Sequence, residues 1–270
     1  MSKKISTLTI SYTLFLILLF LSGYLSGVLS RIVYLLSGII PLLLCFFLSR
    51  DELSGEKSRF LTLKNENFKL ALPLFAPTVG VIIIVSMITS WLIFMLTGKE
   101  NRVDIGDSFI LALINHALLP ALIEEALFRY LPMRLLSSHS RCVTVFLSAF
   151  FFALIHRSLF TIPYAFIAGV IFMAIDLATD SVIPSLLLHF INNAISVGLI
   201  IYGANPAFAP TVFTILAVLS LVSLVVIIIK REKYKKMFSL AFLSGEKVKF
   251  SLEMLLFAGL TLMIAIMNLL

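Results

Sequence analysis

Long apolar runs separated by short polar segments make up most of the chain. Most of these runs reach the ~18 residues that a membrane-spanning helix needs. They cover residues 8–28, 32–49, 71–97, 109–136, 142–156, 160–178, 182–203, 211–229 and 252–269. The pattern predicts an all-α fold, a polytopic transmembrane helical bundle of about eight or nine spans that forms a single membrane domain over residues 1–270.

Two of the runs depart from a simple straight span. The run 142–156 would be only about 22 Å long as a helix, so we expect it to end inside the protein. The run 71–97 contains Pro73 and Pro77 near its start. We therefore expect a first segment at the interface and a kink before the true span.

Composition agrees with a membrane protein. Hydrophobic residues make up 60% of the chain and charged residues 13%, whereas soluble domains average roughly one-quarter charged residues. The net charge of +7 lies in the loops, so it indicates topology and no nucleic-acid partner. Cys45 and Cys142 have no CxxC spacing, so neither a disulfide framework nor a thiolate metal site is indicated.

The basic residues sort by side when the spans alternate. One side has only Arg31, Lys99, Arg102 and Arg157. The positive-inside rule then predicts a cytoplasmic N-terminus, with the run 8–28 as an uncleaved first span. The other, cytoplasmic side has Lys3, Lys4, Arg50, Lys57, Arg59, Lys64, Lys69, Arg129, Arg134, Arg141, Lys230, Arg231, Lys233, Lys235, Lys236, Lys247 and Lys249.

Three ionisable residues, Glu124, Glu125 and Arg129, interrupt the run 109–136. Charges in hydrocarbon are costly, so such a cluster indicates a functional site. Glu125 and Arg129 are four residues apart and share a helix face, where they can form an ion pair. Glu124 points elsewhere and is free to face a cavity. The alternative is a buried charge network that only holds helices together.

Two other runs contribute polar groups, with Phe152 and His156 in one and His189 and Asn193 in the other. Measured from the cytoplasmic helix ends, Glu124 lies about 20 Å deep, His156 about 22 Å, and His189 with Asn193 about 12 to 18 Å. The four groups therefore share a layer in the middle of the membrane. Phe152 shares a face with His156 and is expected to pack beside its contacts.

Other polar residues have weaker signals. His116 would line the outer side of the same cavity or simply contact a neighbouring helix. Asp176 and Asp180 share a helix face near the cytoplasmic end of the run 160–178. They could bind a cation or a substrate amine, although carboxylates near an interface commonly cap helices or face solvent.

This set of groups suffices for hydrolysis of an acyl bond. Glu124 can take a proton from water, and Asn193 with one histidine can donate hydrogen bonds to the developing oxyanion. A divalent metal such as zinc is the alternative, with Glu124, His156 and His189 as ligands, although the HExxH spacing is absent. The residues alone do not choose between glutamate-activated and metal-activated water.

Three motifs resemble those of the CAAX protease and bacteriocin-processing (CPBP, or Abi) family of intramembrane endopeptidases. They are Glu-Glu-x-x-x-Arg at 124–129, Phe-x-x-x-His at 152–156 and His-x-x-x-Asn at 189–193. Each occurs in its own apolar run, in the order of the family. The resemblance extends over about residues 109–193 and is of the type II CAAX prenyl endopeptidase kind.

The resemblance implies a catalytic core at 108–203 with its site open toward the cytoplasm, between N-terminal spans at 1–107 and C-terminal spans at 204–270. It implies a small membrane-associated or lipidated peptide as substrate, and bacterial roles in peptide maturation, signalling-peptide export or immunity to bacteriocins. It leaves the metal question open. The implied roles are Glu124 as general base, His156 as an assisting or ligand histidine, His189 and Asn193 as oxyanion donors, and Glu125, Arg129 and Phe152 as supports.

Two other functions remain as alternatives. The first is a non-catalytic membrane protein for immunity or scaffolding that binds a partner membrane protein. The second is a cation or proton transporter that uses Glu124, Asp176 and Asp180, which is less favoured because the chain shows no inverted repeat. The sequence does not indicate an oligomeric state.

Overall fold

The computed structural model describes residues 3–53, 61–62, 64–101, 105–106, 108–242 and 250–269, and every regular element in these ranges is helical. This confirms the predicted all-α bundle. The helices are α1 (Lys3–Ser22), α2 (Gly27–Leu48), α3 (Arg50–Leu53), α4 (Asn65–Ala71), α5 (Phe75–Thr97), α6 (Phe109–Ala112), α7 (Leu119–Glu125), α8 (Leu131–Leu135), α9 (Arg141–Leu154), α10 (Ile162–Thr179), α11 (Ile183–Tyr202), α12 (Phe208–Ile229), α13 (Arg231–Phe242) and α14 (Leu252–Met267).

The predicted apolar runs all appear as helices, but they are not equally long. In the described residues, seven helical segments are long and apolar enough to cross a membrane, while α9 and α14 are shorter apolar helices. The short α9 agrees with the expectation that the run 142–156 ends inside the protein. The run that begins at residue 71 also starts with an irregularity, because a 3-10 turn at Leu72–Leu74 separates α4 from α5.

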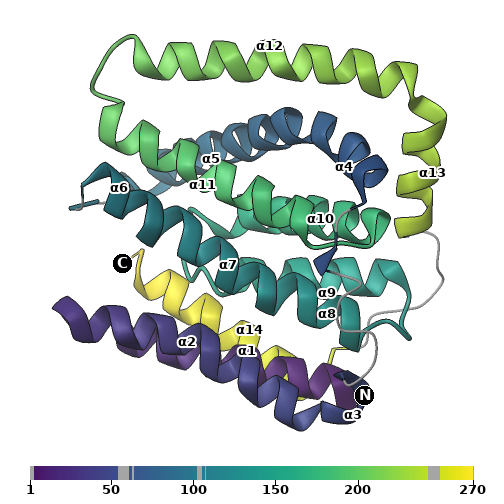
Figure 1. Ribbon diagram of the computed structural model, residues 1–270. Helices are drawn as coiled ribbons and strands as arrows, with labels where there is room; N and C mark the ends of the chain where they lie inside the picture. Colours follow the sequence, from purple (N-terminus) through teal and green to yellow (C-terminus); the bar gives the residue numbers. More distant parts are fainter. Residues whose placement is uncertain are drawn as a thin grey trace.

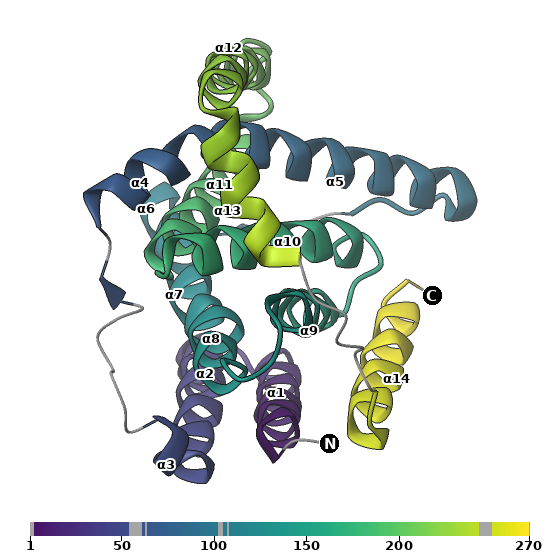
Figure 2. The same cartoon turned by 90° about the vertical axis from the view of Figure 1, so that its right-hand side faces the viewer.

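Most of the helices run between two ends of the bundle (Figure 1). One end, which we call the α13 end, has α3, α4 and α13 together with the N-terminus. The opposite end, which we call the α6 end, has α6 and the C-terminus. Seen from the α13 end, α12 lies at one edge beyond α5, and α1, α2 and α14 lie at the other, with α7, α9, α10 and α11 between them (Figure 2).

The segment Phe109–Leu135 is one continuous helical stretch that contains two π-helical turns, at Leu113–Leu118 and Ala126–Tyr130. Each turn ends two residues before a proline, Pro120 or Pro132. Proline has no N–H, so the carbonyl four residues earlier loses its α-helical donor and the helix widens there. The charged motif falls on the second of these turns.

Other helices, together with Arg129 of the turn itself, supply the hydrogen bonds that the second π turn needs. The carbonyl of Phe128, four residues before Pro132, accepts hydrogen bonds from the Ser148 hydroxyl and from an Arg129 guanidinium nitrogen 3.1 Å away. The Tyr12 hydroxyl donates to the carbonyl of Leu127 at 2.9 Å. Polar backbone groups in hydrocarbon must be paired within the protein, so α1 and α9 help to stabilise this irregular turn.

An aromatic core surrounds the same turn. The ring of Tyr12 stacks on Phe128 with 4.6 Å between centroids and lies 4.8 Å from Phe151. On the other side of α9, a Cβ atom added at Gly169 would lie 2.8 Å from the Cα of Ala149. Helices α9 and α10 therefore pack backbone against backbone, which fixes the position of the α9 end that leads to His156.

Candidate active site

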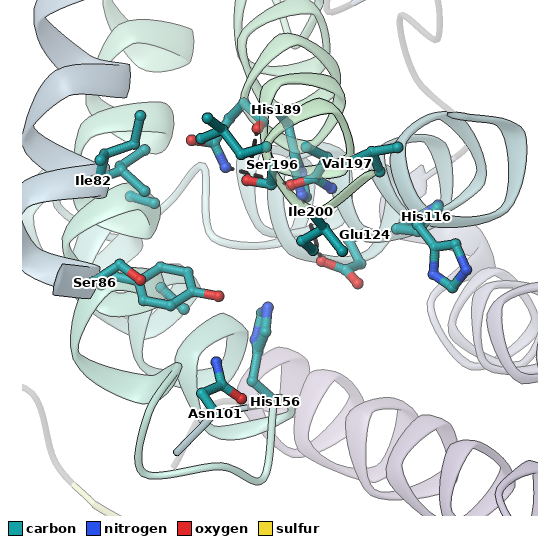
Figure 3. Close-up of a pocket in the computed structure, with 18 of the residues that line it drawn as sticks. Ile82, Ser86, Asn101, His116, Glu124, His156, His189, Ser196, Val197 and Ile200 are labelled. Carbon is teal, nitrogen blue, oxygen red and sulfur yellow. Dashed lines mark hydrogen bonds and ion pairs between the residues drawn. The ribbon is translucent and has the colours of Figure 1, made fainter. Parts of the chain in front are cut away.

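A cavity of about 570 Å³ lies among α5, α7, α9, α10, α11 and α12. The four predicted side chains Glu124, His156, His189 and Asn193 all line it, and so does Phe152. Figure 3 shows several of the lining residues, with Glu124 and His156 directed into the same space. The structure thus brings together groups from three separate apolar runs, as their depth predicts.

Glu125 does not face the cavity; it lies in the protein interior between two cationic or polar partners. Its Oε2 atom is 3.4 Å from Nε of Arg129, which confirms the predicted pair. Its Oε1 atom accepts a hydrogen bond from Nδ1 of His189 at 2.8 Å. This second contact, between residues of two different helices, is not part of the expectation from sequence. Glu125 therefore connects the charged motif to α11.

Arg129 is completely buried, with 0% of its side chain exposed. Beyond Glu125, its guanidinium donates to the hydroxyl of Ser148 at 3.2 Å. It also lies over the ring of Phe152, 4.5 Å from the ring centroid, where a cation is attracted by the aromatic face. These contacts allow a full positive charge to be held in the bundle interior.

Glu124 has a different environment from its neighbour. Its side chain is 14% exposed, and Oε2 lies 3.8 Å from Nε2 of His189, too long for a hydrogen bond. Within the described residues, this buried Oε2 atom has no hydrogen-bond partner. A carboxylate oxygen that is buried in a polar cavity without a partner is suited to bind a water molecule or a substrate group.

His156 follows the end of α9. Its Nδ1 atom lies 2.8 Å from the carbonyl oxygen of Phe152. A carbonyl can only accept, so Nδ1 carries the proton and Nε2 of the neutral ring is an acceptor that faces the cavity. Arg157, the next residue, has a left-handed φ of 51°, which ends the helix at the level of the site.

His189 and Asn193 are one turn apart on α11, as predicted. Because Nδ1 of His189 donates to the carboxylate of Glu125, its Nε2 atom faces Glu124. The side-chain oxygen of Asn193 accepts a hydrogen bond from the Asn192 amide at 3.4 Å. This orientation leaves the amide N–H groups of Asn193 as donors. The ring of Phe152 meets His189 edge-on, 5.7 Å between centroids.

The two aspartates of α10 do not form a shared site. Asp176 is buried and accepts hydrogen bonds from the backbone N–H of Ser185, at 3.1 Å, and from its hydroxyl. It therefore caps the N-terminus of α11, where Ser185 lies one turn before His189. Asp180 instead ends α10 in a left-handed conformation. The sequence allowed either a cation or amine site or a helix-capping role for these aspartates, and the capping role fits Asp176.

The predicted ligand residues Glu124, His156 and His189 do not form a metal centre in the described part of the chain. Within the described ranges, no three His, Cys, Asp or Glu side chains are grouped so that they could hold one metal ion. The set Glu124, His156 and His189 therefore does not fit a zinc site in this arrangement. His189 in particular directs Nδ1 to one carboxylate and Nε2 toward another.

Sequence reasoning also missed several residues of the cavity wall. Asn101, Tyr164 and Asn192 line the cavity. Tyr164 and Asn192 are polar residues within apolar runs, a signal that could have pointed to them. Asn101 lies in a connection between helices, where polar residues are common. His116 also lines the cavity, on the other side of Glu124 from His156 (Figure 3).

Comparison with known proteins gives one family. Residues 106–195 match the model of the type II CAAX prenyl endopeptidase Rce1-like family. No curated protein and no solved structure matches the chain. The matched segment contains all three motifs and every predicted site residue, so over residues 106–195, a third of the chain, this protein is similar to the Rce1-like family of CAAX-type endopeptidases.

Proposed function

We propose that the protein hydrolyses peptide bonds of a small membrane-associated or lipidated peptide, with water activated by Glu124. The observation that carries the proposal is the unpaired Oε2 atom of Glu124 in a cavity that it shares with His156, His189 and Asn193. A carboxylate, two imidazoles and a carboxamide around one space are the groups that acyl hydrolysis requires.

In the first step, a water molecule bound between Glu124 and Nε2 of His156 attacks the peptide carbonyl carbon. Glu124 accepts one proton of this water, and the acceptor nitrogen of His156 orients the other hydrogen. The new C–O bond forms as the carbonyl π bond becomes an oxyanion. In the second step the C–N bond breaks, and Glu124 returns the proton to the leaving amine.

Asn193 stabilises the oxyanion in this scheme. Its amide N–H groups are directed away from Asn192 and can donate to the developing charge. His189 can donate from Nε2 only as the imidazolium, because Nδ1 already donates its hydrogen to Glu125. We therefore assign the constant donor role to Asn193, and assign His189 a second donor role in its protonated form.

Glu125 and Arg129 act through His189. The chain of contacts from Arg129 through Glu125 to His189 holds the imidazole ring in one orientation. The glutamate-dependent mechanism is favoured over a metal-dependent one because the donor atoms are not grouped as a ligand set. A bacterial plasma membrane and a role in peptide maturation or bacteriocin immunity complete the proposal.

Peptide termini in cells provide a test that does not require a known substrate. Membranes from cells that express the wild-type chain or the Glu124→Gln variant would be compared by mass spectrometry of new N- and C-termini. We expect cleavage products that disappear in the variant. The control is Glu232→Gln, which makes the same change at an exposed position on α13.

Two results would reject this function. The first is the same set of termini in the wild type and Glu124→Gln. The second is a protective effect against a bacteriocin that Glu124→Gln retains in full, which would favour the non-catalytic immunity protein instead.

A further inference from the structure

The exposed part of the cavity wall lies toward one end of the bundle. Six of the lining residues are exposed: Met87, Asn101, His116, Ser196, Ile200 and Phe213. Asn101 belongs to the connection between α5 and α6, at the α6 end (Figure 1). The other five lie in the halves of their helical segments that are nearer to this end, with Met87 close to the middle of α5. The cavity is therefore reached from the α6 end.

Toward the α13 end, the cavity is closed by buried side chains. Phe152, Phe172 and His189 line its floor, and each is buried. Behind them lie Glu125, Arg129 and Asp176, which are also buried, with exposed fractions of 2%, 0% and 0%. A peptide cannot enter through this closely packed polar and aromatic layer.

Specific contacts show which connections gather at each end. At the α6 end, Asn268 donates to the carbonyl of Arg157 at 3.0 Å, and Lys99 contacts the carbonyl of Leu269. At the α13 end, Asn67 donates to the carbonyl of Thr179 at 2.7 Å. Tyr234 likewise joins α13 to the carbonyl of Leu70 at 3.0 Å. The two ends are thus composed of different loops.

Basic residues are concentrated at only one of these ends. In the described ranges, the α6 end has Arg31, Lys99 and Arg157. The α13 end has many more basic residues, and the positive-inside rule therefore makes it the cytoplasmic end. Arg102, Lys57, Arg59, Lys247 and Lys249 lie outside the described residues. The α13 end has Lys3, Lys4, Arg50, Lys64, Lys69, Arg134, Arg141, Lys230, Arg231, Lys233, Lys235 and Lys236.

The cavity is reached from the α6 end, whereas basic residues are concentrated at the α13 end. From these two observations we propose that the cavity opens on the extracytoplasmic side of the membrane. The inference rests on the proposed peptidase function for its substrate class, which becomes a peptide segment exposed on, or just inside, the outer leaflet. It differs from the cytoplasmic opening that the family resemblance implies. A lipidated tail held at the cytoplasmic leaflet would not reach Glu124 by this route.

Thiol labelling in intact cells tests the direction of access directly. In a background with Cys45→Ala and Cys142→Ala, single cysteines would be placed at Asn101→Cys and Ser196→Cys on the exposed cavity wall. The matched control is Lys235→Cys, on the exposed surface of α13. A membrane-impermeant maleimide is added to whole cells, and then to permeabilised cells, and the labelled fraction is measured.

We expect Asn101→Cys and Ser196→Cys to be labelled in whole cells, and Lys235→Cys only after permeabilisation. Labelling of Asn101→Cys only after permeabilisation would overturn the inference, whatever the behaviour of Ser196→Cys. The measurement needs no turnover. A labelling result that contradicts the access route would therefore not contradict the peptidase function. Likewise, an absence of peptide cleavage would not contradict the access route.

Discussion

Nδ1 of His189 donates a hydrogen bond to Oε1 of Glu125 across 2.8 Å, between residues 64 positions apart in the chain. Glu125 at the same time lies 3.4 Å from Arg129. One carboxylate therefore both neutralises a fully buried guanidinium and orients the imidazole next to Glu124. The charged motif acts as a connection between two helices, and its loss should affect stability and activity together.

Replacing Glu125 by Gln removes the negative charge beside Arg129. A buried charge that loses its partner destabilises a protein by about 3–5 kcal/mol, so we expect a strongly lowered thermal unfolding temperature in detergent and a loss of peptide cleavage. The control is Glu66→Gln, because Glu66 forms an exposed pair with Lys69 at 3.2 Å. Such surface pairs contribute only about 0.2–1 kcal/mol. Equal stability of the two variants would contradict the structural role of Glu125.

Substitutions at two neighbouring phenylalanines, Phe151 and Phe152, distinguish an effect on packing from an effect on catalysis. Phe152 contacts Arg129, His156 and His189, whereas Phe151 packs on Tyr12 and Phe257. Substitution of either by Leu should lower the free energy of unfolding by about 1–3 kcal/mol. Only Phe152→Leu should reduce kcat, because it removes the aromatic ring that contacts Arg129, His156 and His189. A similar kcat for the two variants would show that Phe152 acts through packing alone.

Asp176 should matter for the position of α11. The Asp176→Asn variant retains an acceptor for one of the two Ser185 donors and loses the other. We expect a loss of about 1–3 kcal/mol and a lower kcat, because His189 follows Ser185 by one helical turn. Asp180→Asn is the control, since asparagine tolerates the left-handed conformation at that position. Circular dichroism melts and cleavage assays on both variants would check this, and an equal effect on both would contradict it.

The close contact between α9 and α10 depends on Gly169. A methyl group there would lie 2.8 Å from the Ala149 backbone, and overpacking of this kind costs about 1–3 kcal/mol. At Gly259 in α14, no atom lies within 4 Å of the same methyl position. Gly259→Ala should therefore stabilise the helix by up to about 1 kcal/mol. Thermal unfolding of the two variants should shift in opposite directions, and a shift in the same direction would contradict the packing.

The sequence predicts the helical bundle and the four cavity residues because both depend on local rules. Apolar run length predicts spans, four-residue spacing places Glu125 beside Arg129, and helical rise gives the depth of His156. These rules apply along a single helix, and the structure agrees with them.

Contacts between helices are not predicted in the same way. The Glu125 to His189 bond depends on which face of α11 meets α7, and this is determined by packing. The prolines Pro120 and Pro132 are visible in the sequence, yet whether they produce a kink or a π turn depends on partners such as Tyr12 and Ser148 from other helices. The side from which the cavity is reached likewise depends on the connection that contains Asn101.

The most direct test of the central claim is the cleavage rate of the purified Glu124→Gln variant on a peptide identified from the termini of wild-type membranes. General base catalysis contributes about 10²–10⁴-fold, so we predict a loss of at least about 10²-fold in kcat/KM. Unfolding in detergent should be unchanged, because Oε2 of Glu124 has no hydrogen-bond partner within the described part of the chain. The cavity-lining variant His116→Gln is the control and should retain activity. A Glu124→Gln protein that is folded and cleaves at the wild-type rate would contradict the account.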